Sequence, residues 1–465
     1  MKKLSPKTKL CYAVGNLGYG TVSQAMNSFI MFFATSVLGI KGSLVGLAIA
    51  LSALWDGISD PIIGHISDKS KNKFLGKRLN FMLLASIGIP VFNILLWIIP
   101  NTLSSTIKFV WLLLSLLAIE TFNTLFATPY VALGFDIAPD YNEQSSVQGF
   151  KTVFFILGMI MPSVLMILFM PSKQNAQAQF LQSGYINIGI VTSTICLLSS
   201  IISIIGTRKK AKQITYKETK KEKKEKFSTL VKEFFGAVLS KTYGPIIIGY
   251  SIALISSAFL ISVGMHLFTY SYHFSSVQIP ILMAFLFVGA IVSQPFWIFL
   301  SNRLDKKPSL NIALVTILVG IAITSVTFIF RDFMQNATLF WLTCPCIFVC
   351  GFGTGALYSL PISMYADVIT LDRIKTGQNK SALYSGFMTL SYNISNSIAL
   401  FVIGILLDLI KFDSSQPVQA LSVQNSLGFI VFVGCALAIS LSIVVFSKYK
   451  IKRADVLKAQ MKQKH

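Results

Sequence analysis

Two long stretches of this sequence carry no formal charge, and they limit the folds open to the chain. No Asp, Glu, Lys or Arg lies between Lys9 and Lys41, or in the 61 residues between Lys241 and Arg303. About 20 apolar residues cross the hydrocarbon core of a bilayer as a helix, so the longer stretch must hold two spans. The polar segment 271–276 is the natural break between them. The chain is therefore predicted to be a polytopic integral membrane protein.

The whole chain has the composition of such a protein. Only 12% of its 465 residues are charged and its mean hydropathy is +0.68, whereas soluble domains carry about 25% charged residues. In lipid, backbone polar groups must be satisfied within each segment, so the spans should be α-helices. The apolar windows predict twelve of them, near 10–39, 42–67, 79–100, 107–134, 148–171, 184–206, 243–270, 277–302, 309–330, 337–366, 382–409 and 424–447.

A basic segment divides these helices into two groups of six. The stretch from Arg208 to Lys232 is the most polar inside the chain and falls between the sixth and seventh spans. Two pseudo-symmetric bundles around a midplane site are typical of secondary transporters. The expected domains are an N-terminal six-helix bundle, a basic cytoplasmic linker, a C-terminal six-helix bundle and a basic cytoplasmic tail, at 1–206, 207–241, 242–447 and 448–465.

The distribution of positive charge indicates orientation in a membrane. The net charge is +22, and with both termini in the cytoplasm the cytoplasmic segments hold 35 of the 40 Lys and Arg residues. This is the positive-inside bias of membrane proteins, and it explains the charge without a nucleic-acid partner. We expect a multi-pass protein of the cytoplasmic (inner or plasma) membrane with cytoplasmic N- and C-termini. The first apolar run is too long for a signal peptide and is predicted to be the first helix.

Acidic residues inside a span are the strongest functional signal, because each costs roughly 2.5–3.5 kcal/mol or more at mid-bilayer. Asp56 and Asp60 lie four residues apart in the second span and share one helix face, with Ser59 on its edge. Two carboxylates this close repel each other unless a bound cation or a proton neutralises part of the charge. The sequence therefore predicts a cation or proton site here. The alternative is a structural ion pair, for which Lys151 is the one deep basic candidate.

The fourth span has a polar face of its own. Glu120, Asn123, Thr124 and Ala127 recur at helical spacing. Glu120 is expected either to be a second proton or substrate group or to pair with Lys151. Beyond the second span, Asp68 and the following basic residues suit an interhelical latch, or simply reflect the positive-inside charge.

Other functional classes find little support. The six cysteines fall inside spans, without a neighbouring His, and are interpreted as small apolar helix residues. No nucleophile–base pair, metal-ligand spacing or phosphate loop is recognisable, so we expect no enzymatic activity and no metal beyond a Na⁺ at the cation site. A membrane receptor or scaffold would need a large soluble domain, and no segment is long enough for one.

The motif around the two aspartates resembles a known family. Trp55–Asp56-x-x-x-Asp60–Pro61-x-x-Gly64-x-x-x-Asp68, with Gly76–Lys77–Arg78 eight residues later, is similar to the glycoside–pentoside–hexuronide:cation symporters. That family includes melibiose permease and belongs to the major facilitator superfamily. The resemblance covers nearly the whole chain. Its weaker matches are Asn16–Leu17–Gly18, Gln294–Pro295 through Lys306–Lys307–Pro308, and Ala366–Asp367–Val368–Ile369.

The resemblance implies a fold and a set of functional residues. It implies the major facilitator fold, an all-α integral membrane protein of twelve helices in two six-helix bundles, with alternating access and Na⁺- or H⁺-coupled uptake. The implied cation-binding residues are Asp56, Asp60, Ser59 and Thr124. The implied cytoplasmic gate consists of Gly64, Asp68, Gly76, Lys77, Arg78 and Asp367.

The substrate site departs from the family pattern. The two aspartates with which melibiose permease holds its sugar correspond to Gly20 and Ala127, so a galactoside specificity is not supported. The candidate substrate contacts are Asn16, Tyr19, Glu120, Asn123, Lys151 and Tyr358. We expect a monomeric, cation-coupled symporter whose partners are the coupling ion, the bilayer and a small solute, foremost a sugar or glycoside. The alternative is an uncoupled facilitator, or a transporter of a lipid-like or other organic solute on the same scaffold.

Overall fold

The structure, a computed structural model, confirms the all-α prediction for the part of the chain that it describes. The described residues are 4–70, 78–138, 141–171, 178–215, 236–376, 381–413, 416, 418–451, 453–456 and 458, and all regular structure among them is helical. Eleven of their helical segments are long and apolar enough to cross a membrane. The first helix is less apolar than these, since it carries Asn16, Gln24 and Asn27.

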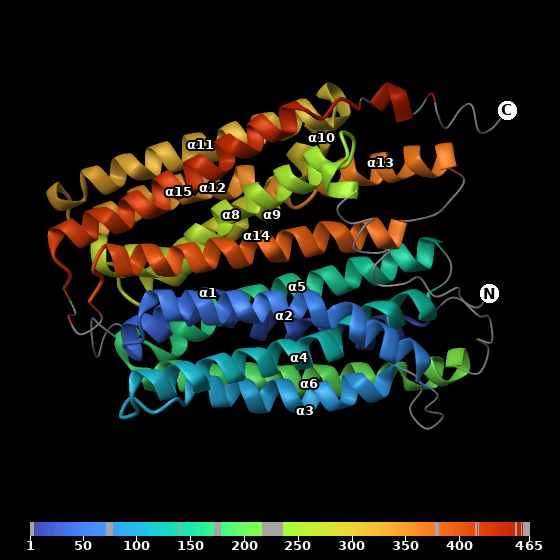
Figure 1. Ribbon diagram of the computed structural model, residues 1–465, viewed down its shortest axis with the longest axis horizontal. Coiled ribbons are helices and arrows are strands. Elements are labelled where there is room, and N and C mark those ends of the chain that lie inside the picture. Colours follow the sequence, from blue (N-terminus) through green and yellow to red (C-terminus); the bar gives the residue numbers. More distant parts are fainter. Residues whose placement is uncertain are drawn as a thin grey trace. The chain divides into compact units, whose positions relative to one another are not determined.

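The helices follow the predicted spans closely (Figure 1). In the first half they are α1 (Pro6–Phe32) with its π-helical continuation η1 (Phe33–Val37), α2 (Gly42–Lys69), α3 (Leu79–Trp97), α4 (Ser105–Ile137), α5 (Tyr141–Phe169), η2 (Ala178–Phe180) and α6 (Gln182–Thr215). In the second half they are α8 (Gly244–His266) with η3 (Leu267–Ser271), α9 (Gln278–Val292), α10 (Gln294–Leu304), α11 (Lys306–Ile329), η4 (Arg331–Phe333), α12 (Asn336–Leu357), α13 (Leu360–Thr376), α14 (Ser381–Leu409) and α15 (Leu421–Ser447).

The chain forms two compact units. The first contains the described residues of 1–222, 275–280 and 401–417, and the second contains the rest. Two contacts explain why the short segments belong to the first unit. Ser276 donates to the carbonyl of Met170, and the Asp408 carboxylate accepts from the backbone N–H groups of Gly42 and Ser43 at 2.7 and 2.9 Å. The second contact places an anion at the N-terminus of α2, where the helix dipole favours it.

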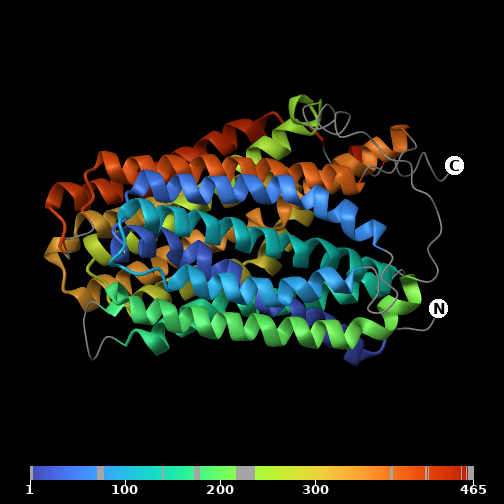
Figure 2. The ribbon, with the colours of Figure 1, turned by 60° about the horizontal axis from the view of Figure 1, so that its bottom comes forward.

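Within the first unit, α1 packs against α5 and α6, α3 packs against α4 and α6, and α2 packs against α4. The neighbouring course of α3 and α6 can be followed in Figure 1 and Figure 2. Polar side chains fix these crossings. Asn93 of α3 donates to Thr192 and Ser193 of α6, at 3.0 and 2.9 Å. The hydroxyls of Tyr12 and Tyr130 each donate to the other residue's carbonyl, and their rings stack.

In the second unit α8 packs against α15, and α11 packs against α12 and α15. Two predicted spans are broken here. The span 277–302 divides at Ser293 into α9 and α10, and the span 337–366 divides after Leu357 into α12 and α13. Pro295 and Pro361 lie in the first turns of the second pieces, where the missing N–H group is tolerated.

The predicted basic linker, 207–241, begins as helix. α6 continues to Thr215, and residues 216–235 lie outside the described part of the chain. The division into the four predicted domains stays a prediction.

Candidate functional site

The candidate site lies along the contact between α2 and α4, and its geometry follows from the register of these helices. Thr124 donates to Asp56 at 2.9 Å, and Thr128 donates to Asp60 at 3.0 Å. Each threonine follows its aspartate by 68 positions, so one helical turn along α2 is matched by one turn along α4. The two helices therefore run in the same direction and present a ladder of carboxylates and hydroxyls.

Ser59 and Thr124 join the two rungs of this ladder. Their hydroxyls lie 3.0 Å apart, and both side chains are buried, with 3% and 1% of their surface exposed. Thr124 is also within hydrogen-bonding reach of Asp60. The structure thus brings together all four predicted cation-site residues and adds Thr128. Gly64 lies one turn further along α2, where an added Cβ would touch the Thr128 methyl group at 3.4 Å.

Glu120, one turn before Thr124 on α4, forms a second polar group with Asn123. Asn123 donates through Nδ2 to Glu120 Oε2 at 3.2 Å. Asp56 and Asp60 lie within electrostatic range of Glu120, and all three acids lie within range of the Tyr19 side chain. Two of the predicted substrate contacts, Tyr19 and Glu120, therefore lie within electrostatic range of the aspartate pair, and a third, Asn123, is hydrogen-bonded to Glu120.

Two other predicted contacts have structural partners instead. Lys151 Nζ lies 5.7 Å from the centre of the Tyr130 ring, and its backbone carbonyl accepts from Asn16 Nδ2 at 3.3 Å. Within the described part of the chain, Lys151 forms no ion pair with Glu120 or Asp60. Glu120 and Lys151 are therefore not paired in the described structure, and the role of Glu120 stays a prediction.

The gate residues are only partly described. Arg78 forms an ion pair with Asp136 at the end of α4, with Nε and Oδ2 2.6 Å apart. Asp367 of α13 pairs with Lys306 at the start of α11, at 2.5 Å. Gly76 and Lys77 and the side chain of Asp68 lie outside the described residues, so the predicted latch between them stays a prediction.

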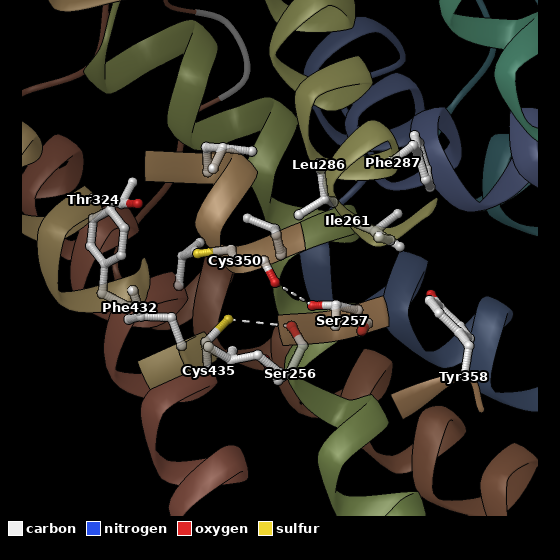
Figure 3. Close-up of a pocket in the computed structure, with 17 residues that line it drawn as sticks. Ser256, Ser257, Ile261, Leu286, Phe287, Thr324, Cys350, Tyr358, Phe432 and Cys435 are labelled. Atoms are coloured by element: carbon white, nitrogen blue, oxygen red, sulfur yellow. Dashed lines mark hydrogen bonds between the residues drawn. The ribbon is translucent and has the colours of Figure 1, made fainter. Parts of the chain in front are cut away.

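The second unit contains a separate cavity of about 50 Å³ between α8, α9, α11, α12 and α15 (Figure 3). Its lining is largely apolar, with hydroxyls and thiols at intervals. Cys350 and Cys435 lie near one another, and Cys435 donates to the Ser256 carbonyl. Tyr358, the sixth predicted substrate contact, lines this cavity in the second unit.

Sequence reasoning missed two residues of the first unit. Thr128 could have been found, since it follows Thr124 by four residues just as Asp60 follows Asp56. Asp136 gave no such signal, because an acid at the end of a span is common at the membrane surface.

The arrangement is chemically suited to a small hard cation. Five oxygen-bearing side chains converge on the α2–α4 contact: Asp56, Ser59, Asp60, Thr124 and Thr128. Carboxylate and hydroxyl oxygens are ligands that hard cations prefer. A bound cation or proton would also relieve the repulsion between the two carboxylates.

Comparison with known proteins agrees with this architecture. The chain is 24% identical over 504 residues to an uncharacterized symporter of Synechocystis sp., covering 91% of this chain and 89% of the relative. It is 23% identical over 482 residues to the sodium-dependent lysophosphatidylcholine symporter 1 of Mus musculus, covering 97% and 86%. It is also 24% identical over 492 residues to the sphingosine-1-phosphate transporter MFSD2B of Xenopus tropicalis, covering 97% and 89%.

Solved transporters share the fold. The crystal structure of the nucleoside transporter NupG matches with a TM-score of 0.65 at 12% identity, covering 96% of this chain and 100% of that one. The xylose transporter XylE from E. coli, in a partially occluded inward-open conformation, matches with a TM-score of 0.61 at 12% identity, covering 96% and 99%. The family described as MFS/sugar transport protein matches residues 11–453. The protein is thus a multi-pass membrane transporter of the major facilitator type, and it belongs to the MFS/sugar transport protein family.

Proposed function

We propose that this protein is a Na⁺-coupled symporter that takes up a small organic solute by alternating access. The observation that carries the proposal is the ladder of Asp56–Thr124 and Asp60–Thr128 hydrogen bonds between α2 and α4. The oxygen ligands favour Na⁺ over a purely protonic site, and several relatives are named as sodium-dependent symporters. The positive-inside bias supports a cytoplasmic membrane with both termini in the cytoplasm, and we expect the monomer to be the working unit.

The proposed mechanism follows from the repulsion between the two carboxylates. A Na⁺ between Asp56 and Asp60, completed by the Ser59 and Thr124 hydroxyls, removes that repulsion and draws α2 and α4 together. The resulting conformation binds the solute more tightly. A ligand shifts a conformational equilibrium only by its differential affinity for the two states. Because the coupling is reciprocal, the solute must tighten Na⁺ binding by the same factor.

Two solute classes fit this scaffold. The family description and the aspartate motif favour a sugar or glycoside of the kind taken by melibiose permease-like symporters. The second candidate is a lipid-like solute, favoured by relatives named for lysophosphatidylcholine and sphingosine-1-phosphate. Gly20 and Ala127, which replace the sugar-binding aspartates, also favour it.

The test has one arm for the ion and one for the solute. Thermal unfolding of the purified protein is followed during titrations with NaCl and with KCl at constant ionic strength. We expect a saturable, Na⁺-selective stabilisation whose midpoint is roughly 100-fold higher in Asp60→Asn. Proteoliposomes are then supplied with labelled sugars and lysophospholipids under imposed Na⁺ or H⁺ gradients. Concentrative uptake driven only by an H⁺ gradient would identify the coupling ion as a proton rather than Na⁺. Uptake independent of both gradients would identify the protein as an uncoupled facilitator.

A further inference from the structure

One buried acceptor next to the candidate ion site has no partner. Asn123 is only 4% exposed, and its Nδ2 donates to Glu120, which fixes the orientation of the amide. Its Oδ1 makes no hydrogen bond. Leaving a buried acceptor unsatisfied destabilises the folded protein. The Asn123 amide is therefore prepared to accept a hydrogen bond from a bound molecule.

The Glu120 carboxylate also has no basic partner among the described residues. Asp56, Asp60 and Glu120 lie within electrostatic range of one another. Among the described residues, however, no group of three or more His, Cys, Asp or Glu side chains could hold a metal ion. A single Na⁺ between the aspartates therefore leaves Glu120 without a ligand of its own. Lys151 does not compensate it, because its ammonium group lies over the Tyr130 ring.

The geometry of Glu120 and Asn123 suits a ligand that brings both a positive charge and N–H donors. A protonated amine provides both: one N–H group to the Glu120 carboxylate and another to Asn123 Oδ1. A quaternary ammonium group has the charge but no donor, so it would leave the amide acceptor unsatisfied. Charge-assisted hydrogen bonds of this type are about twice as strong as neutral ones. The Tyr19 side chain lies within electrostatic range of Glu120.

We propose that Glu120 and Asn123 bind a protonated amine carried by the transported solute. This inference rests on the proposed function, because it assigns the class of solute taken by the same symporter: an amino sugar or an amine-bearing lipid rather than a neutral glycoside. Glu120 and Asn123 hold the ammonium group, while Asp56 and Asp60 keep the coupling ion.

The experiment uses the bare headgroup as the probe. The full-length protein in lipid nanodiscs, held in saturating NaCl to occupy the coupling site, is titrated with methylammonium chloride or tetramethylammonium chloride at constant ionic strength. The readout is the thermal unfolding temperature. We expect a saturable rise with methylammonium and none with tetramethylammonium. The methylammonium midpoint should weaken roughly tenfold or more in Glu120→Gln.

Two further variants keep the test decisive. Asn123→Asp adds a second carboxylate acceptor and should tighten methylammonium binding, which a poorly folded protein would not do. Asp332→Asn removes one negative charge from an exposed side chain of the second unit and should leave the midpoint as in the parent. The inference is overturned if both ammonium ions stabilise equally, if neither does, or if Glu120→Gln binds methylammonium like the parent.

The same samples separate this inference from the proposed function. The Na⁺ midpoint should shift far less in Glu120→Gln, which loses only a neighbouring charge, than in Asp60→Asn, which loses a ligand. A normal Na⁺ response without a methylammonium response would remove the amine assignment alone. Loss of the Na⁺ response in Glu120→Gln would make Glu120 a ligand of a second coupling ion and would also overturn the inference. Absence of any Na⁺ response in the parent would overturn the coupling proposal itself.

Discussion

The second and fourth spans of each half of the chain contact each other, yet only one of these contacts is acidic. In the first half, α2 and α4 meet through Asp56–Thr124 and Asp60–Thr128. In the second half, Gln294 of α10 donates to the Gly355 carbonyl of α12 at 2.7 Å. Both pairs of spans satisfy their polar groups between helices, but the second uses neutral donors on backbone carbonyls.

Two other features occur in both halves. A tryptophan joins the helices in each: Trp55 donates to Thr121 at 2.8 Å, and Trp297 donates to the Phe352 carbonyl at 2.7 Å. A basic residue at the start of the third span also pairs with an acid on the fourth, as Arg78 with Asp136 and Lys306 with Asp367. Since the second half holds together without buried acids in its second span, helix packing does not require Asp56 and Asp60. These two aspartates are costly in a membrane, and binding of a ligand best explains why the second span contains them.

The largest expected effect comes from removing the acid that the second half lacks. Asp60→Asn should lower Na⁺ affinity by roughly 100-fold, because losing one partner of a buried charge interaction costs about 3 kcal/mol. The matched control is Gln294→Asn in the second half, which should leave Na⁺ affinity unchanged. Na⁺-dependent thermal stabilisation measures both. An equal loss in the two variants would mean that the acidic and neutral contacts have the same role.

The success of the sequence prediction differed between charged and uncharged residues. Asp56 and Asp60 could be predicted because carboxylates in an apolar span are costly and rare. Helical spacing placed Thr124 on the polar face of the fourth span, but its role as a cation ligand came only from the family resemblance. Thr128 was missed, because a hydroxyl can satisfy itself on its own helix. Asp136 lies at a span end, where charge is ordinary.

Contacts between segments far apart in the chain also could not be predicted from the sequence. The reciprocal hydrogen bonds of Tyr12 and Tyr130 join residues 118 positions apart, and no periodicity within either helix indicates such a pair. The helix breaks at Ser293 and after Leu357 lie beside Pro295 and Pro361. However, proline also occurs within the unbroken α3, α4 and α5, as Pro90, Pro129 and Pro162. Proline alone therefore does not predict where a span divides.

The two ion pairs allow a second, smaller comparison. The Arg78–Asp136 side chains are 10% and 16% exposed, whereas those of Lys306 and Asp367 are 27% and 21% exposed. Double-mutant cycles with Arg78→Met, Asp136→Asn, Lys306→Met and Asp367→Asn should give a larger coupling energy in the first half. We expect about 1–3 kcal/mol there and about 1 kcal/mol or less in the second. The measurement is the free energy of unfolding in detergent. A larger coupling for Lys306–Asp367 would contradict the role assigned to burial.

Removing a threonine hydroxyl should lower Na⁺ affinity less than removing the Asp60 carboxylate. Thr124→Val removes a ligand and a hydrogen bond to Asp56, which should weaken Na⁺ binding about fivefold, or by about 1 kcal/mol. Thr354→Val is the matched control, because the Thr354 hydroxyl donates to the Cys350 carbonyl of its own helix at 2.8 Å. Thr124→Ser keeps the oxygen and should restore most of the affinity. If Thr124→Ser binds Na⁺ as poorly as Thr124→Val, the threonine methyl group rather than the hydroxyl is the important part.

The smallest expected effect is a change in the pH dependence of stability, and it comes from His273 in the second half. His273 lies between the apolar segments Gly244–Ser271 and Gln278–Leu304. Burial lowers the pKa of its imidazole, Asp332 opposes this shift, and Arg331 adds to it. The unfolded chain, with an imidazole pKa of about 6.5, therefore binds more protons than the folded one, so stability is lost as the pH falls through about 6.5.

The variant His273→Asn tests this pH dependence of stability, and it tests whether the ion site is independent of the second half. Asparagine tolerates the positive φ of 56° at this position. On acidification the unfolding temperature of the variant should fall less than that of the parent, by a small margin because the His273 side chain is exposed. Its Na⁺ midpoint should match the parent at every pH, since the ion site belongs to the α2–α4 contact of the first half. A change in that midpoint would show that the turn holding His273 influences the ion site, and the separation of a charged half from a neutral one would no longer describe the protein.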